Sequence, residues 1–368
     1  MENIDFAENA LNNIFGFVEK LKNRDNFSFK PALDGVIGRG HNLSLGFSTY
    51  GLKLYYMLGE WDRLDKRHKD DWCKYINSFQ ANRKGLPNNS YIDEQVFNFY
   101  SHQSIEDSVK DAIRKLLNNL NKFNFDTNNV RFSKAINAET KQAIATLAQV
   151  GYTSDKEFIP QYDTPELVNK YLYSLDWSKP WTSGAQWSSL CVYSSINSNN
   201  MNEVLLDFID SIVDKDTGSY FVEKPTHPRE IINGAMKILS GLDWVDSPIN
   251  YPEKLIDFCL TNKPVTEGCD IVDYIYVLYR CGKQTDYKKE KVILTINDSI
   301  TEIVKLYDFE SYGFSYFQNK SQDTYYGLPI TSGKKVPDIH GTLLCTWALI
   351  MALDINEKLN SKYKIIKP

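Results

Sequence analysis

Two kinds of helix-length segment alternate along the chain, and they differ in where their apolar residues lie. Segment 341–353 is apolar around its whole circumference and carries no charged residue. Segment 63–83 is charged on most of its circumference and has one apolar stripe. A helix that is apolar all round has no side that suits solvent, whereas a one-sided helix buries a single face. The sequence therefore predicts both interior and outer helices.

The two kinds follow one another in a regular order over much of the chain. The predicted interior helices are 44–59, 184–196, 230–242, 268–281 and 341–353. The predicted outer helices include 63–83, 202–213, 252–260 and 288–307. An inner ring of helices inside an outer ring buries both kinds and leaves a central cavity. Since no segment shows the period-2 pattern of a strand, we predict an all-α fold, a single α/α toroid of about five to six helical hairpins.

We expect this toroid to take up residues 1–368 as one domain. Residues 1–40 are assigned to an N-terminal helix and loop, 44–150 to the first hairpins, and 165–355 to the regular inner and outer hairpins. In such a ring the inner helices share one direction, so the loops before them meet at one end of the cavity. Polar residues in those loops are the first candidates for a functional site.

The composition indicates a large core with a partly polar interior. The chain has 23 Tyr against 19 Phe and 7 Trp. Tyrosine carries a hydroxyl group, so it suits a cavity that contains water as well as a core. The net charge is −5, with acidic and basic residues interspersed and no basic block. This distribution argues against nucleic acid as a partner.

The sequence gives no signal for export or for a membrane span. The N-terminal segment contains acidic residues early and lacks the basic start and apolar stretch of a secretory signal. No window approaches the roughly 18 consecutive apolar residues that a span needs. The 6 cysteines include no CxxC pair. We expect a cytoplasmic protein with reduced cysteines.

Asp338 and His340 open the most apolar helix in the chain. His340 suits a general base or a metal ligand, with Asp338 orienting it. The alternative is that Asp338 caps the helix and His340 is a core residue with satisfied hydrogen bonds. We include both as candidate catalytic residues.

A second group of acidic residues, Glu267, Asp270 and Asp273, surrounds Cys269 at the start of another interior helix. Acids three positions apart share a helix face, and buried carboxylates are costly unless they are hydrogen-bonded or functional. Glu267 and Asp270 are candidate catalytic acids, and Asp273 is a candidate substrate contact. The alternative is that they stabilise the helix dipole. One Cys, one His and these acids give no diagnostic zinc spacing, so no metal site is assigned and no cofactor is required.

Other candidates would bind the substrate at the same end of the cavity. Arg229 and His227 precede an interior helix and suit a phosphate or carboxylate, unless they are simply exposed loop residues. Trp181 can stack on a ligand or pack in the core. Tyr325 and Tyr326 lie in a long loop that would cover the cavity mouth, where Tyr326 can act as an acid. We expect these residues to converge, with His340 and Asp270 in one cavity.

The sequence WCKYINSFQ at 72–80, followed by Gly85, resembles the glutamine-and-aromatic repeat of the terpenoid cyclase and protein prenyltransferase superfamily. Degenerate copies at 205–221 and 303–317 have Asp or Phe where glutamine would stand. The resemblance implies a toroid, an isoprenoid substrate and an enzyme with acid–base chemistry in the central cavity.

The resemblance also has limits in its catalytic motifs. Residues 267–270 and 338–340 are similar to the places from which prenyltransferase β subunits supply zinc ligands, but Glu-x-Cys-Asp stands here in place of Asp-x-Cys. The Asp-x-Asp-Asp acid of class II cyclases and the Asp-Asp-x-x-Asp motif of class I enzymes are both missing from the sequence.

Two other classes of function stay open. Toroids of this size resemble carbohydrate-active enzymes such as polysaccharide lyases, glycoside hydrolases and sugar epimerases, and the tyrosine excess suits a sugar. A non-catalytic toroid that binds a peptide or glycan is the third class. The cavity lining distinguishes them: Phe, Trp and Leu favour an isoprenoid, Tyr, Asn, Arg and carboxylates favour a sugar, and a plugged apolar cavity favours the binding protein.

Overall fold

The computed structural model describes residues 2–102, 105–120, 125–197, 201–223, 225, 227–264 and 268–368. These residues are mostly helical, which confirms the all-α prediction. They also form two small antiparallel hairpins, β1 (Gln80–Ala81) with β2 (Ser90–Tyr91) and β3 (Thr324–Tyr325) with β4 (Leu328–Pro329). Both hairpins connect helices, and they add the buried side chains of Tyr91, Tyr325 and Leu328 to the core.

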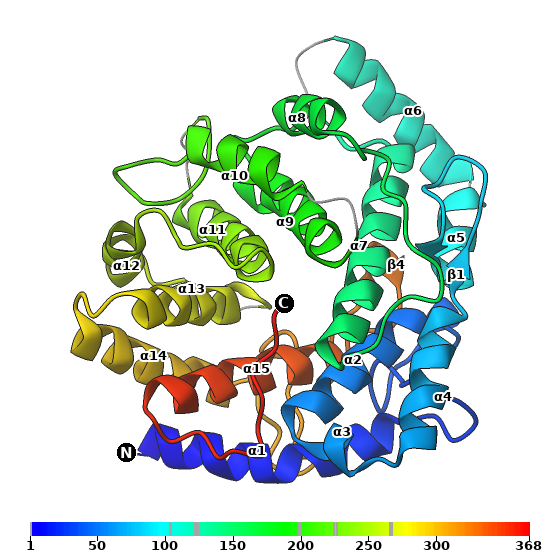
Figure 1. The fold of residues 1–368 in the computed structure, drawn as a ribbon. Helices are drawn as coiled ribbons and strands as arrows, with labels where there is room; N and C mark the ends of the chain where they lie inside the picture. Colours follow the sequence, from blue (N-terminus) through cyan, green and yellow to red (C-terminus); the bar gives the residue numbers. More distant parts are fainter. Residues whose placement is uncertain are drawn as a thin grey trace.

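Six helices pack against one another in a closed cycle around the middle of the molecule (Figure 1). In the order of the cycle they are α2 (Leu45–Met57), α7 (Asn128–Gln149), α9 (Pro180–Ile196), α11 (Pro228–Trp244), α13 (Asp270–Gln284) and α15 (Ile339–Ile355). Helix α15 packs back on α2 and closes the cycle. Five of the six match the predicted interior helices. The sixth, α7, was not predicted as interior because Glu139 and Lys141 interrupt its apolar pattern.

The other helices lie outside this cycle or connect its members. Helix α1 (Glu2–Leu21) packs on α15 and on α14 (Lys289–Val304), α10 (Asn202–Ser211) packs on α9, and α12 (Pro252–Thr261) packs on α13. The remaining helices are η1 (Gly38–His41), α3 (Glu60–Arg63), α4 (Lys66–Asn77), α5 (Glu94–Ser101), α6 (Ile105–Asn119) and α8 (Pro165–Ser174).

The predicted outer helix 63–83 is shorter than expected, because α4 covers only Lys66–Asn77, α3 ends at Arg63, and residues 80–81 belong to β1. Asp65 is the N-cap of α4, and its side chain accepts a hydrogen bond from the His68 N–H at 2.8 Å. Such a cap starts a new helix because it satisfies one of the free N–H groups at the helix N-terminus. The charged stretch is therefore split after α3.

Proline and glycine fix how closely two of the inner helices approach. Pro180 and Pro228 stand in the first turns of α9 and α11, where a missing N–H costs nothing. A Cβ atom at Gly234 would lie 2.6 Å from the Cβ of Pro180. The two backbones can pack at this distance only because residue 234 has no side chain.

Residues 364–368 lie across the ends of the inner helices, in the middle of the cycle (Figure 1). The Lys364 N–H donates to the carbonyl of Met57 at the end of α2, at 3.0 Å. The Trp244 indole N–H at the end of α11 donates to the carbonyl of Pro368 at 3.0 Å. These contacts show that α2 and α11 point the same way and that this segment covers their C-terminal end.

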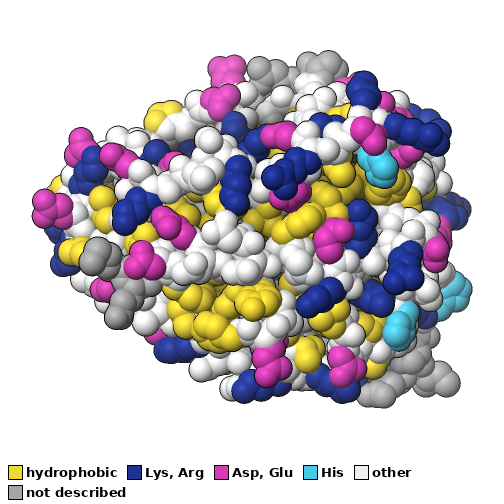
Figure 2. All heavy atoms as spheres, turned by 90° about the horizontal axis from the view of Figure 1, so that it is seen from below, with side chains coloured by type: hydrophobic (Ala, Val, Ile, Leu, Met, Phe, Trp, Pro, Cys, Tyr) yellow, Lys and Arg dark blue, Asp and Glu magenta, His cyan; other side chains and the backbone are white. Residues whose placement is uncertain are grey.

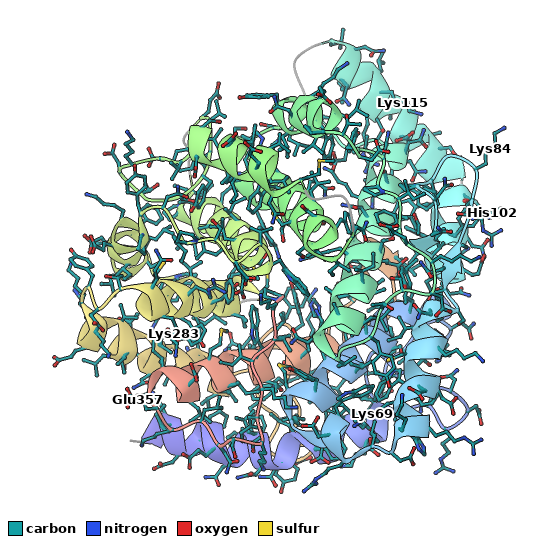
Figure 3. The ribbon with its side chains drawn as sticks, in the orientation of Figure 1. Lys69, Lys84, His102, Lys115, Lys283 and Glu357 are labelled. Carbon is teal, nitrogen blue, oxygen red and sulfur yellow. The ribbon has the colours of Figure 1, made fainter. Side chains whose placement is uncertain are left out.

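Charged side chains of both signs are spread over the outside of the molecule. In Figure 2 they intermingle on the face shown, and in Figure 3 the labelled Lys84 and Lys115 lie at the edge of the molecule. No helix among the described residues is long and apolar enough to span a bilayer.

Candidate functional site

A cavity of about 360 Å³ lies inside the cycle of helices, and every inner helix contributes to its wall. The contributions include Lys53 of α2, Lys141 of α7, Trp181 of α9, Lys237 of α11, Asp273 of α13 and His340 of α15. The loop before α15 adds Tyr316, Tyr325 and Tyr326, and the C-terminal segment adds Ile366 and Pro368. We call this space the central cavity.

His340 lies in the first turn of α15 with its ring between two tyrosine rings. The centroids of Tyr50 and Tyr316 each lie 4.9 Å from the imidazole, both nearly parallel to it. The Nδ1 atom is buried and makes no hydrogen bond with the described residues. Burial and the positive charge of Lys237 lower the pKa of His340 to about 3. The imidazole is therefore neutral, and a cavity ligand can bond to its free nitrogen.

Asp273 faces the cavity from one turn inside α13, with only 1% of its surface exposed. Its Oδ2 atom has no hydrogen-bond partner among the described residues. Burial raises the pKa of Asp273 to about 7, although Lys237 acts in the opposite direction. A carboxyl group with such a pKa can give or take a proton near neutral pH, which is the property of a general acid or base.

Three lysines of the central cavity, Lys53, Lys141 and Lys237, were not predicted as site residues. Within the described part of the chain, none of them makes a salt bridge or a hydrogen bond through its ammonium group. Burial lowers the pKa of Lys53 to about 8, and burial together with Lys237 and Lys53 lowers the pKa of Lys141 to about 7. Buried charges are normally paired, so these lysines indicate an anion that is not part of the chain.

A signal for these lysines was present in the sequence. Lys53 is the only charged residue in the predicted interior helix 44–59. Lys237 is likewise the only charged residue between Glu230 and Asp243. A single lysine in an otherwise apolar interior helix must point into a cavity or be paired. Lys141 gave no such signal because α7 was not predicted as interior.

Unpaired polar atoms collect in the central cavity. Besides Asp273 Oδ2 and His340 Nδ1, the Trp347 indole N–H is buried without a partner among the described residues and lines the same space. A buried polar group without a partner costs free energy, so such groups normally bond to water or to a ligand. The cavity wall is therefore suited to a polar molecule.

The two tyrosines of the loop are placed as predicted, at the central cavity. The Tyr325 hydroxyl reaches the buried Glu139 carboxylate at 3.4 Å, and a Cβ on Gly46 would lie 2.1 Å from that hydroxyl. Tyr326 is 37% exposed and has a left-handed backbone with φ of 45°. Tyr325 is thus fixed in the wall, whereas Tyr326 faces open space.

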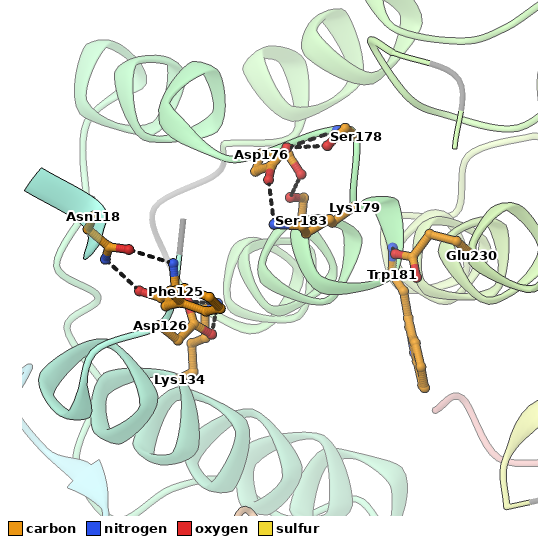
Figure 4. Close-up of polar contacts among 10 residues, drawn as sticks. All are labelled: Asn118, Phe125, Asp126, Lys134, Asp176, Ser178, Lys179, Trp181, Ser183 and Glu230. Carbon is orange, nitrogen blue, oxygen red and sulfur yellow. Dashed lines mark hydrogen bonds and ion pairs between the residues drawn. The ribbon is translucent and has the colours of Figure 1, made fainter. Parts of the chain in front are cut away.

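Trp181 also lines the central cavity, from the first turn of α9. Its backbone N–H donates to the Glu230 carboxylate at 3.0 Å, and its ring points away from that contact (Figure 4). The nearby Asp176 accepts hydrogen bonds from Ser178, which fixes the turn before α9 (Figure 4). The Arg229 guanidinium lies over the Trp181 ring, with its carbon 5.2 Å from the ring centroid, so one face of the ring is covered.

Asp270, Arg229 and His227 line a different space, an outer pocket of about 960 Å³ at the starts of α9, α11 and α13. Arg229 Nε lies 2.7 Å from Asp270 Oδ2, and the Asn233 amide donates to Asp270 Oδ1 at 2.8 Å. The prediction that Asp270 shares a cavity with His340 is wrong. Asp270 lies at the outer pocket, where both partners of its carboxylate, Arg229 and Asn233, come from α11. Asp273 takes the place predicted for Asp270.

Asp338 stabilises the helix start rather than facing a ligand. Its carboxylate accepts hydrogen bonds from the backbone N–H groups of Gly341 (2.7 Å), Tyr316 (2.7 Å) and Gln322 (3.0 Å). Burial raises the pKa of Asp338 to about 6, and these N–H groups oppose the rise. The prediction of a catalytic Asp338 is replaced by the capping alternative, because no oxygen of the carboxylate is left for a substrate.

The remaining predictions concern Glu267 and a metal. Glu267 lies outside the described residues. Burial raises the pKa of Cys269, so this cysteine stays a neutral thiol and a poor metal ligand. No group of three His, Cys, Asp or Glu in the described ranges has the geometry of a metal site.

Comparisons with known proteins identify no relative of this chain. No family model, no curated protein and no solved structure matches it significantly. The central cavity is therefore the feature of the molecule that bears on its function.

Proposed function

We propose that this protein is an α/α toroid enzyme whose central cavity binds a small anionic molecule of the carbohydrate class and carries out acid–base chemistry on it. The toroid assignment is supported by the closed cycle of inner helices and by the one-sided helices packed outside it. A cytoplasmic location, where such small metabolites occur, is part of the proposal.

The observation that carries the proposal is the set of three lysines around one cavity whose ammonium groups have no partner among the described residues. Lys53, Lys141 and Lys237 come from three different helices and share a space of about 360 Å³. An ammonium group is a point charge with three donors, which suits a phosphate or a carboxylate. A ligand with such a group would pair the lysines and recover the cost of their burial.

The rest of the wall suits a hydroxylated ligand. Tyr50, Tyr316 and Tyr326 offer hydroxyl groups, Gln142 and Gln322 offer amides, and the rings of Trp181 and Trp347 offer flat apolar surfaces. Sugars need both hydrogen-bond partners and a stacking face. By the criterion set from the sequence, this lining favours the carbohydrate-active class over an isoprenoid enzyme.

The acid–base roles fall to Asp273 and His340. Asp273, with a pKa of about 7, can exchange a proton with the ligand, and the neutral His340 can accept a hydrogen bond through Nδ1. Proton transfer at a carbon is the chemistry of lyases and epimerases, and proton transfer to the glycosidic oxygen is that of glycoside hydrolases. Tyr326 lines the same cavity and is our candidate for a second acid, although burial and the charge of Glu139 raise the pKa of its hydroxyl group.

An isoprenoid with an anionic head group is the second candidate. Met236, Leu343 and Leu344 form an apolar part of the wall beside the lysines. The repeat-like sequence at 72–80 also supports this candidate. The two candidates share the lysines and differ in whether the body of the ligand is hydroxylated or hydrocarbon.

Ligand-induced thermal stabilisation would test the proposal. We would measure the unfolding temperature with sugar phosphates, uronic acids, the matching neutral sugars and prenyl diphosphates. A ligand at a hundredfold of its Kd adds about 2.7 kcal/mol to the free energy of unfolding. We expect stabilisation by anionic sugars and none by neutral ones. Stabilisation by prenyl diphosphates alone would favour the second candidate, and no stabilisation by any anion would reject both.

Lysine variants provide a matched control for this test. Lys53→Met should weaken anion binding about tenfold or more, because a charged hydrogen bond is worth about 1.5–3 kcal/mol. Lys69→Met removes an equal charge from the outer helix α4 and should leave the affinity unchanged (Figure 3).

A further inference from the structure

Lys141 differs from the other two lysines of the central cavity because both of them act on it. It lies on α7, which packs directly against α2, and it lines the central cavity together with Lys53 of α2 and Lys237 of α11. The Cys191 thiol of α9 is also near Lys141. Burial raises the pKa of this thiol, so it stays protonated and neutral. No carboxylate neutralises this ammonium among the described residues.

We propose that Lys141 is a nucleophilic amine that forms an imine with a carbonyl group of the anionic ligand, while Lys53 and Lys237 hold the anion. The inference rests on the proposed function and names the reacting group of that same site. A lysine in an enclosed space beside other cations is the environment that activates an amine for imine formation.

The physical reason is the cost of a third positive charge in a small space. Burial and the two neighbouring ammonium groups all favour the neutral form of Lys141, which brings its pKa to about 7. A neutral amine has a free electron pair on nitrogen, whereas an ammonium group has none. At neutral pH a large fraction of Lys141 is therefore ready to react, and an exposed lysine is not.

The reaction balances without an oxidant or a reductant. The nitrogen of Lys141 adds to the carbonyl carbon, and one proton moves from nitrogen to the carbonyl oxygen, which gives a carbinolamine. The C–O bond then breaks, the second amine proton leaves with the oxygen as water, and a C=N bond remains. Asp273, which faces the same cavity, can exchange protons during these steps.

This chemistry narrows the class of substrate. The ligand must carry a phosphate or carboxylate together with an aldehyde or ketone, as the open-chain form of a sugar phosphate or a sugar acid does. An isoprenoid diphosphate has no carbonyl group and cannot react. Imine formation would therefore favour the carbohydrate candidate over the isoprenoid one.

Borohydride trapping on the full chain would test the inference. Pyridoxal 5′-phosphate, an anionic aldehyde, would be added at pH 7.5 and the imine reduced to a stable secondary amine. Peptide mapping by mass spectrometry should then find the adduct mainly at Lys141. Pyridoxal without the phosphate should label Lys141 several-fold less, and pyrophosphate should protect it.

Two variants separate a failed nucleophile from a failed binding site. Lys141→Arg removes the nucleophilic amine and leaves a cationic side chain, so the variant should lose the adduct and still bind pyrophosphate, as measured by calorimetry. Lys69→Arg should change neither property. If pyrophosphate binds and protects but no adduct forms at Lys141 in the unchanged protein, the nucleophile is rejected and the anion site stands.

The opposite result is equally informative. An adduct at Lys141 that pyrophosphate does not protect, in a protein that does not bind pyrophosphate, would leave the nucleophile and reject the anion site. Equal labelling of Lys141 and of exposed lysines such as Lys69 would overturn the inference, because it would show that the cavity does not activate the amine.

Discussion

Two inner helices, α13 and α15, each begin with two polar residues that serve different purposes. On α13, Asp270 is paired with Arg229 and Asn233, whereas Asp273 leaves one oxygen free in the central cavity. On α15, Asp338 accepts three backbone hydrogen bonds, whereas His340 leaves Nδ1 free in the same cavity. The paired residue holds the helix start and the unpaired one faces the ligand space.

The difference shows how to separate structural from functional polar groups when all of them are buried. Burial alone does not separate them, because Asp270, Asp273 and Asp338 are all at most 4% exposed. What separates them is whether every oxygen has a partner within the fold. An unpaired buried group costs about 1–3 kcal/mol, so a stable protein retains several in one place only where a ligand or water completes them.

The largest expected effect that would sharpen this comparison is the pH dependence of stability caused by Asp273. Burial raises its pKa from 3.8 to about 7, so the folded state favours the protonated form. The stabilising contribution of that form is complete below pH 4 and is lost as the pH rises through 7. Asp273→Asn keeps the neutral form at every pH. The variant should match the wild type at pH 4 and exceed its free energy of unfolding by up to about 4 kcal/mol at pH 8.

Urea unfolding of both proteins from pH 4 to pH 8 would measure this difference. Asp270→Asn serves as the control, because it changes a carboxylate one turn earlier that is ion-paired. The free energy of unfolding of Asp270→Asn should stay below that of the wild type at both pH 4 and pH 8. If Asp273→Asn and the wild type differ in free energy of unfolding by the same amount at every pH, Asp273 belongs with the paired groups.

Asp338→Ala should have the next largest effect, and in the destabilising direction. The change removes the acceptor of three backbone N–H groups in a site that is 1% exposed. Loss of the cap and the buried donors left behind should lower the free energy of unfolding by about 3 kcal/mol. Asp338→Asn, which retains one carbonyl oxygen, should lose less. Equal stability of the wild type and the Ala variant would contradict the structural role.

Asp270→Ala should cost less than Asp338→Ala, about 1–2 kcal/mol in the same urea experiment. Asn233 is buried and would lose its partner, but the Arg229 side chain is 59% exposed and can return to water. Lys66→Ala, which breaks the exposed Lys66–Asp70 pair on α4, is the control and should cost under about 0.5 kcal/mol. A loss as large as that of Asp338→Ala would show that the outer pocket is as closed as the core.

The sequence predicted most of the helices because their apolar patterns follow from how many sides each helix buries. It placed Asp270, Asp273, Asp338 and His340 correctly at the starts of inner helices. It could not distinguish the paired from the unpaired ones, because the partners come from distant segments, such as Arg229 on α11 or Tyr316 in the loop before α15.

The lysines show a second limit of the sequence. Lys53 could have been identified as a single charge in an apolar helix. Lys141 could not, since α7 also carries Glu139, and that carboxylate is buried in the wall with Tyr325 rather than in the cavity. The two residues are two positions apart and point to different sides of one helix. Only the packing of α7 against α2 and α9 decides which of them faces the ligand space.

Substitution of His340 should have the smallest effect on the free energy of unfolding. A large effect would contradict the comparison of paired and unpaired residues most directly. His340→Phe keeps an aromatic ring between Tyr50 and Tyr316 and removes the unpaired Nδ1. Since the imidazole is neutral and that nitrogen has no partner in the fold, the free energy of unfolding should change by less than about 0.5 kcal/mol. Affinity for the anionic sugar that gives the largest thermal stabilisation should fall by about tenfold, because one hydrogen bond to the ligand is lost. Urea unfolding and calorimetry on the same sample would give both numbers. A stability loss approaching that of Asp338→Ala, with affinity unchanged, would mean that His340 holds the fold and that the ligand lies elsewhere.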